Sequence, residues 1–126
     1  MSVPTNLGYT ADHEWVLVEG DIATVGVTAY AADALGDVVF VDLPEPGTEV
    51  TAGAPCGEVE STKSVSEVYS PVSGEITEVN AALESAPETI NQAPYGDGWL
   101  FQARVFAEPT DLLSAQEYEQ MTKDEE

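Results

Sequence analysis

The chain has 126 residues, with 24 acidic side chains, three basic ones and a formal net charge of −21. This charge excludes a nucleic-acid-binding surface, because phosphate recognition requires clustered Lys and Arg. With 43% apolar residues, this length predicts one globular domain over residues 1–126, with its core over about 14–106.

Strands dominate the predicted elements in chain order. Strands are predicted over residues 15–18, 22–27, 38–43, 58–62, 64–69, 74–79 and 98–106. Gly20 suits a hairpin turn between the first two. Thr28 can cap a short helix over 29–35, which Gly36 would end. The strand over 38–43 is expected to be buried.

The last third of the chain predicts a loop, a strand and a helix. Pro87 and Pro94 favour a mainly loop conformation over residues 82–98. Ser114 and Glu117 form a capping box, which predicts a C-terminal helix over about 111–123.

A weak internal repeat has an offset of 27 residues. Val38, Val41, Pro44 and Gly47 align with Val65, Val68, Pro71 and Gly74. Each copy is predicted to be a strand, a Pro-x-x-Gly segment and a second strand, related by an approximate twofold axis. The junction near residue 63 would then be an exposed turn.

Lys63 is one of only two lysines, the other being Lys123. Most lysines are simply solvated, but this chain almost eliminates the residue, which favours a function that needs a primary amine. A Schiff-base lysine needs a desolvated or cation-lined setting, whereas Lys63 has acidic neighbours at 58, 60 and 67. An exposed turn instead suits an attachment point for an acyl group.

Two other reactive residue types are interpreted as structural. His13 is the only histidine and has no partners at metal-ligand spacing. Cys56 is the only cysteine, which excludes an internal disulfide, and it has no activating neighbour in the sequence.

Longer motifs along nearly the whole chain resemble the glycine cleavage H-protein family. They lie at residues 13–16, 36–44, 60–63, 70–75, 78–80, 91, 94–96 and 98–99. The resemblance implies a mainly β barrel-sandwich hybrid, with short peripheral helices and a C-terminal helix. It also implies (R)-lipoate covalently attached to Lys63. Thr62 and Ser64 replace the Val and Ala more usual beside that lysine.

The resemblance extends to further site residues. It places Gly47, Glu60 and Gly74 at the spacings that lipoylating enzymes recognise. Asp12, Glu14 and Glu67 match the region that lines the cleft for the loaded arm. Carboxylates there would hold a cationic aminomethyl group electrostatically.

The implied function is that of a non-catalytic carrier with four kinds of partner. The decarboxylase (P-protein) would load an aminomethyl group from glycine, the aminomethyltransferase (T-protein) would pass its methylene to tetrahydrofolate, and dihydrolipoyl dehydrogenase (L-protein) would restore the disulfide. A lipoate ligase or lipoyl synthase would modify the chain. Two alternatives stay open: a lipoyl donor for 2-oxo-acid dehydrogenase complexes, and an unmodified acidic binding module.

The sequence also predicts the surroundings of the protein. No apolar run is long enough to span a bilayer, and residues 1–5 lack the features of a signal peptide. We therefore expect a cytoplasmic protein with no membrane or nucleic-acid partner. The evenly spread acidity favours a halophilic source, where concentrated salt screens self-repulsion, over a merely acidic protein.

Overall fold

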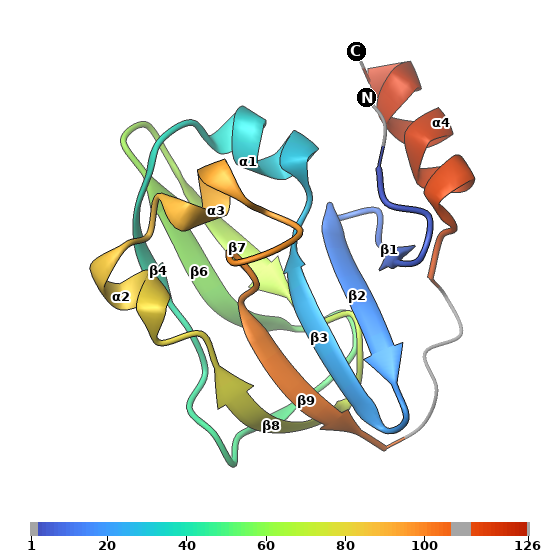
Figure 1. Cartoon of the computed structure of the whole chain (residues 1–126), viewed down its shortest axis with the longest axis vertical. Coiled ribbons are helices and arrows are strands. Elements are labelled where there is room, and N and C mark those ends of the chain that lie inside the picture. Colours follow the sequence, from blue (N-terminus) through green and yellow to red (C-terminus); the bar gives the residue numbers. More distant parts are fainter. Residues whose placement is uncertain (1–2, 107–111, 126) are drawn as a thin grey trace.

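The computed structural model describes residues 3–106 and 112–125 and places nine strands in two antiparallel sheets (Figure 1). The larger sheet comprises, in spatial order, β1 (Gly8–Tyr9), β2 (Glu14–Glu19), β3 (Ile22–Val27), β9 (Phe101–Val105), β8 (Gly74–Val79) and β5 (Glu49–Val50). The smaller sheet comprises β4 (Val38–Asp42), β6 (Pro55–Ser61) and β7 (Val65–Tyr69). The two sheets enclose one core, which confirms the predicted barrel-sandwich hybrid.

Helix α1 (Ala29–Leu35) connects the two sheets. Its predicted caps are confirmed: Thr28 Oγ1 accepts a hydrogen bond from the Ala31 N–H at 3.2 Å, and Gly36 ends the helix at a φ of 84°. Such a positive φ favours glycine, which has no Cβ to clash. The helix therefore ends immediately before β4.

The segment 82–98, predicted to be mainly loop, also contains two one-turn helices that the sequence did not predict. These are α2 (Ala82–Ser85) and α3 (Thr89–Gln92), each with one buried apolar residue, Leu83 and Ile90 respectively. Asn91 on α3 accepts from the Val38 N–H at 2.9 Å and donates to the Gly36 carbonyl at 2.8 Å. The local sequence has few helix-forming signals, so these helices are stabilised instead by burial of Leu83 and Ile90 and, for α3, by the hydrogen bonds of Asn91.

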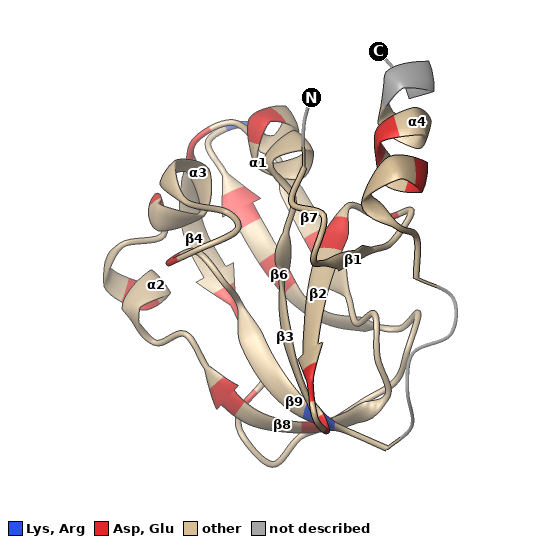
Figure 2. Ribbon diagram, turned by 45° about the vertical axis from the view of Figure 1, so that its right-hand side comes forward, with Lys and Arg blue, Asp and Glu red and all other residues tan. Residues whose placement is uncertain are grey.

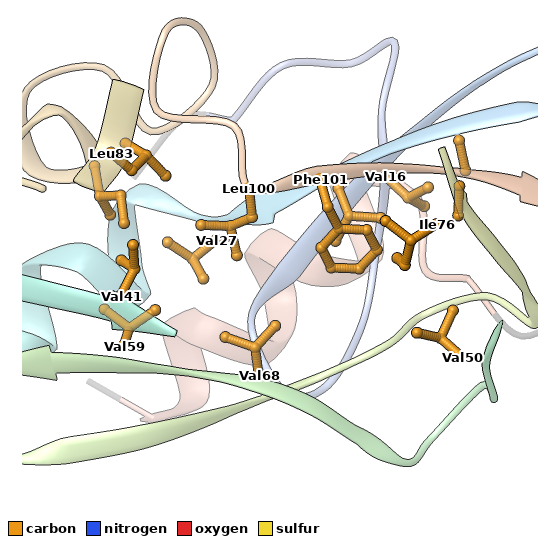
Figure 3. Packing of buried hydrophobic residues seen from close by; sticks show 14 of the residues in the cluster. Val16, Val27, Val41, Val50, Val59, Val68, Ile76, Leu83, Leu100 and Phe101 are labelled. Carbon is orange, nitrogen blue, oxygen red and sulfur yellow. The ribbon is translucent and has the colours of Figure 1, made fainter. Parts of the chain in front are cut away.

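The main core lies between the sheets (Figure 3). Val59 and Val68 of the smaller sheet face Val27 and Phe101 of the larger one, and all four are at most 5% exposed. The prediction that the strand at 38–43 is buried holds only for Val38 and Val41 in the part that forms β4. A register shift in the β4–β6 pairing between Val38 and Phe40 leaves Val39 and Phe40 exposed.

The C-terminal helix α4 (Ala115–Glu125) packs on a second apolar cluster that includes Val3, Tyr9, Trp15 and Tyr118. The capping box is confirmed: the Glu117 N–H donates to Ser114 Oγ, and the Ser114 N–H donates to the Glu117 carboxylate. The predicted start near residue 111 is too early: residue 111 itself lies outside the described residues, but residues 112–114 are described and precede the helix, which begins at Ala115. The last predicted strand, 98–106, is shortened to β9.

The two copies of the repeat occupy comparable places in the sheets but differ in their environments. Strands β4 and β7 both pair with β6, and β5 pairs with β8. Val41 and Val68 are both buried, whereas Val38 is 2% and Val65 is 56% exposed. A twofold relation between the copies stays a prediction.

Candidate functional site

Lys63 lies at an exposed turn between β6 and β7, as predicted. The Ser61 hydroxyl organises this turn by accepting from the N–H groups of Lys63 at 3.3 Å and of Ser64 at 3.1 Å. The Thr62 N–H donates to the Asp37 carbonyl at 3.1 Å, which attaches the turn to the end of α1. The backbone of the turn is thus fixed while the lysine side chain faces solvent.

The Lys63 side chain runs beside Gly36. A Cβ added to Gly36 would lie 3.4 Å from Lys63 Cε. The lysine stem therefore lies over the C-terminal end of α1, at the same end of the molecule as the β6–β7 hairpin (Figure 1).

A groove of about 280 Å³ begins next to this turn and runs between α1 and β7. Its lining is apolar over most of its area, with several polar residues among the apolar ones. The apolar lining comprises Val27, Ala31, Ala34, Leu35, Val59, Val65 and Val68, and the polar lining comprises His13, Glu14, Tyr30, Ser64, Ser66 and Glu67. The groove is therefore adjacent to Lys63 through Ser64 and reaches carboxylates on two strands.

Glu14 supplies a buried carboxyl group to this groove, since the residue is only 3% exposed. One carboxyl oxygen accepts from the Thr10 hydroxyl at 2.7 Å, and the other accepts from the Tyr69 N–H at 3.2 Å. Burial raises the pKa of Glu14 to about 7; the two hydrogen bonds oppose this shift and the negative charge of Asp12 adds to it. Glu14 therefore titrates near neutral pH.

The structure brings two of the three predicted cleft residues together. Glu14 and Glu67 both line the groove, whereas Asp12 is exposed and lies outside the lining. A hydrogen bond with Glu67, followed by its charge, raises the pKa of Tyr69. From outside the groove, the negative charge of Asp12 raises the pKa values of Glu14 and Tyr69.

The three predicted recognition residues do not cluster around Lys63. Glu60 lies on β6 opposite Val65, close to the turn. Gly47 has a φ of 93° and lies on the β4–β5 connection, and Gly74 begins β8; in Figure 1 these elements lie at the end of the molecule away from the β6–β7 hairpin. A Cβ at Gly74 would overlap the Arg104 carbonyl oxygen. Backbone geometry thus gives both glycines a structural role, whether or not an enzyme recognises them.

Sequence reasoning missed the contribution of α1 and of Thr10 to the site. Tyr30 on α1 lines the groove and stacks on His13, with ring centroids 4.6 Å apart. The His13 Nδ1 lies 2.7 Å from the Tyr118 hydroxyl on α4, a contact over 105 residues of sequence. The structural interpretation of His13 therefore stands, but its ring also forms part of the groove wall.

Cys56 has the unreactive character that the sequence indicates. Burial, and secondarily the charge of Glu14, raises the pKa of its thiol to about 12. Within residues 3–106 and 112–125, no three His, Cys, Asp or Glu side chains are grouped so that they could hold a metal ion. In the same part of the chain, no helix is long and apolar enough to cross a membrane.

Acidic positions are spread over both sheets and several helices (Figure 2). Basic positions appear in that view at the β6–β7 hairpin and at β9. On β9, Arg104 forms an ion pair with Glu75 at 3.4 Å. The hairpin therefore presents a positive charge within strongly negative surroundings.

Comparison with known proteins gives one consistent family. The family model described as "Glycine cleavage H-protein" matches residues 7–125. A "Glycine cleavage system H protein" of Thermobifida fusca is 58% identical, over 99% of this chain and 99% of the relative. That of Streptomyces coelicolor is 60% identical, over 94% and 95%. The crystal structure of a glycine cleavage system H protein from Mycobacterium marinum matches with a TM-score of 0.91 at 48% identity, over 96% of this chain and 99% of that one.

Proposed function

The chain belongs to the glycine cleavage H-protein family, and we propose that Lys63 is the residue on which it carries (R)-lipoate. It is the non-catalytic lipoyl carrier of a glycine cleavage system. Its partners are the decarboxylase (P-protein), the aminomethyltransferase (T-protein) and dihydrolipoyl dehydrogenase (L-protein). A lipoate ligase or lipoyl synthase would modify the lysine.

The observation that supports Lys63 is its place at a fixed, exposed turn beside a groove. An attaching enzyme needs an accessible amine, and the carrier needs somewhere to shelter the loaded group. Lipoate, when bound, supplies the disulfide that accepts the aminomethyl group of glycine. The turn and groove fit such a group because Ser64, the residue after Lys63, lines the groove.

The groove would protect the cargo through its own residues. Its apolar lining limits access of water to the carried amine. Glu14 would accept a hydrogen bond from the cationic amine and, on doing so, lose the proton that its raised pKa lets it keep at neutral pH. Glu67 would add a second carboxylate at the groove, and Asp12 would add long-range negative charge from outside it.

Two arginine variants test the attachment site. Arginine cannot form the amide, so Lys63→Arg should gain no lipoyl mass when the unmodified protein is incubated with lipoate, ATP and a lipoate ligase. Lys123→Arg removes the other lysine and is the matched control, which should gain one lipoyl group like the wild type. Lipoylation of Lys63→Arg, mapped to Lys123 by peptide mass, would overturn the assignment.

We extend the proposal to the remaining features of the chain. Gly47, Glu60 and Gly74 are candidate recognition residues for the lipoylating enzyme, Glu60 being supported by its position near the turn. Residues 1–126 would form one lipoyl-carrier domain in the cytoplasm, where soluble glycine cleavage enzymes would operate. The net charge of −21 supports a halophilic source.

A further inference from the structure

The outer face of the three-stranded sheet carries an exposed apolar row beside the Lys63 turn. Phe40 on β4 pairs with Glu60 on β6, which pairs with Val65 on β7. Directly opposed residues in antiparallel strands project from the same face. Phe40 and Val65 are each 56% exposed. We call Phe40 and Val65, which flank the half-buried Glu60, the apolar row; Val65 also lines the edge of the groove.

Few other large apolar side chains are exposed in the structure. Among the described residues, Val39, Phe40, Val65 and Phe106 are the exposed large hydrophobics. Three of these four lie on the sheet that carries the Lys63 turn. Exposed apolar side chains that gather on one face are characteristic of interaction sites, whereas single ones need no explanation.

An acidic row lies next to the apolar row on the same face. Asp42 pairs with Glu58, and Glu58 pairs with Glu67. All three residues are exposed, and Glu67, at the edge strand, also lines the groove. Like charges placed directly opposite each other in a sheet are destabilising, so this row does not serve the stability of the isolated chain. It would instead complement a basic surface on a partner.

We propose that the apolar row and the acidic row together form the docking face for the enzyme that attaches lipoate. This proposal rests on the proposed attachment at Lys63. The partner surface would have an apolar recess for Phe40 and a rim of Lys and Arg facing the acidic row. Aromatic anchors surrounded by charged residues are typical of interfaces with a few dominant contacts.

The reach of the lysine selects this partner among the enzymes of the system. Val65 is two residues from Lys63, about 7 Å along the strand, and the apolar row is about 10 Å wide across the three strands. An enzyme that acylates the bare amine has to lie within the length of one lysine side chain of this face. The three cleavage enzymes act at the far end of the longer lipoyl arm, so they need not lie this close to the face.

The test compares two exposed phenylalanines. Phe40→Thr truncates the apolar row, and threonine is a good strand residue. Phe106→Thr is the matched control, because Phe106 is 61% exposed and lies next to β9 outside the three-stranded sheet. Neither residue lines the groove. The measurement is kcat/KM for lipoylation of each unmodified protein by a lipoate ligase, with the Tm of each variant recorded.

Phe40→Thr should lower kcat/KM about tenfold or more, as expected of an interface anchor, while Phe106→Thr should stay within about twofold of the wild type. Once fully lipoylated, Phe40→Thr should support glycine cleavage at the wild-type rate. Equal lipoylation of the two variants would overturn the proposed docking face. Normal lipoylation of Phe40→Thr combined with slower glycine cleavage would also overturn it, and would assign the face to a cleavage enzyme instead. Attachment at another lysine would instead overturn the proposed function.

A separate observation concerns Tyr118, which is fully buried on α4. Its hydroxyl lies 2.7 Å from His13 Nδ1 and 2.7 Å from Thr28 Oγ1. His13 lines the groove, and Thr28 caps α1, the helix that forms one groove wall. One hydroxyl on the C-terminal helix therefore connects two elements that shape the groove.

The geometry points to Tyr118 as a positioning residue for the groove, without contact to the cargo. The hydroxyl can donate to His13 and accept from Thr28, or the reverse, so it holds either histidine tautomer. Tyr9 is a natural control, because its ring stacks on Tyr118 at 4.9 Å but its hydroxyl donates to the Pro4 carbonyl, outside the groove.

Tyr118→Phe and Tyr9→Phe each remove one hydroxyl from the same aromatic cluster. In the loaded carrier, Tyr118→Phe should accelerate spontaneous release of the aminomethyl group severalfold and shift the ¹⁵N resonances of the His13 ring, while Tyr9→Phe should change neither. Lipoylation should be normal in both. Equal release from the two variants, or an unchanged His13 spectrum in Tyr118→Phe, would overturn the positioning role.

Discussion

Replacing Glu14 with glutamine should change how the stability of the protein depends on pH. The side chain is 3% exposed, and its pKa rises from 4.5 to about 7 on folding. Because the folded pKa of this acid is raised, its charged form destabilises the folded state above pH 7. The penalty disappears as pH falls from 7 to 4.5, where both states become protonated. A pKa difference of this size corresponds to about 3 kcal/mol of unfolding free energy.

The assay is urea unfolding of wild type and Glu14→Gln between pH 8 and pH 4.5 at fixed ionic strength. The other carboxylates titrate in both proteins, so their effect cancels in the difference. The stability of Glu14→Gln relative to wild type should fall by about 3 kcal/mol from pH 8 to pH 4.5. A difference that is constant across this range would refute the reasoning, because it would mean that Glu14 titrates normally in the folded protein.

Three further predictions follow from the same contacts and charges. Gly74→Ala should lower the unfolding free energy by about 1–3 kcal/mol, because its Cβ would overlap the Arg104 carbonyl oxygen; unchanged urea unfolding would leave enzyme recognition as the reason for this glycine. Glu14→Ala should speed spontaneous loss of the aminomethyl cargo without changing lipoylation, and equal release rates would contradict the role of Glu14. The Tm should rise steeply from millimolar to molar KCl, because a charge of −21 opposes compaction until salt screens it; a flat Tm would remove the argument for a halophilic source.

Local chemistry explains why much of the fold could be predicted from the sequence. The helix at 29–35 has a hydroxyl cap at one end and a glycine at the other, and both act as expected. The Ser114–Glu117 capping box likewise marks the start of α4. The exposed turn at Lys63 was predicted because two strand patterns meet there. Each of these signals is contained in a few adjacent residues.

The parts that could not be predicted depend on contacts between distant residues. The one-turn helices between 82 and 98 rely on burial of Leu83 and Ile90 in a core built by other elements. The exposure of Phe40 follows from a register shift against β6, which no pattern within β4 encodes. The groove is likewise assembled from β2, α1 and β7, so residue identity alone does not separate Glu14 inside it from Asp12 outside it.

The raised pKa of Glu14 leads to a further expectation for the loaded carrier. At pH 7 about half of the empty carriers hold a proton on this carboxyl group, which avoids a buried unpaired charge. The cationic cargo has to displace that proton, so protons compete with cargo below pH 7, weakening its retention by up to about tenfold per pH unit.

The rate of cargo release should therefore rise as pH falls from 8 to 5.5 in the wild type. Glu14→Gln is the control for the pH dependence of the release chemistry itself, since it keeps the groove but cannot titrate. The ratio of the two release rates, mutant over wild type, should be largest at pH 8 and approach one at pH 5.5. A ratio that is independent of pH would show that Glu14 holds the cargo, if at all, without exchanging a proton for it.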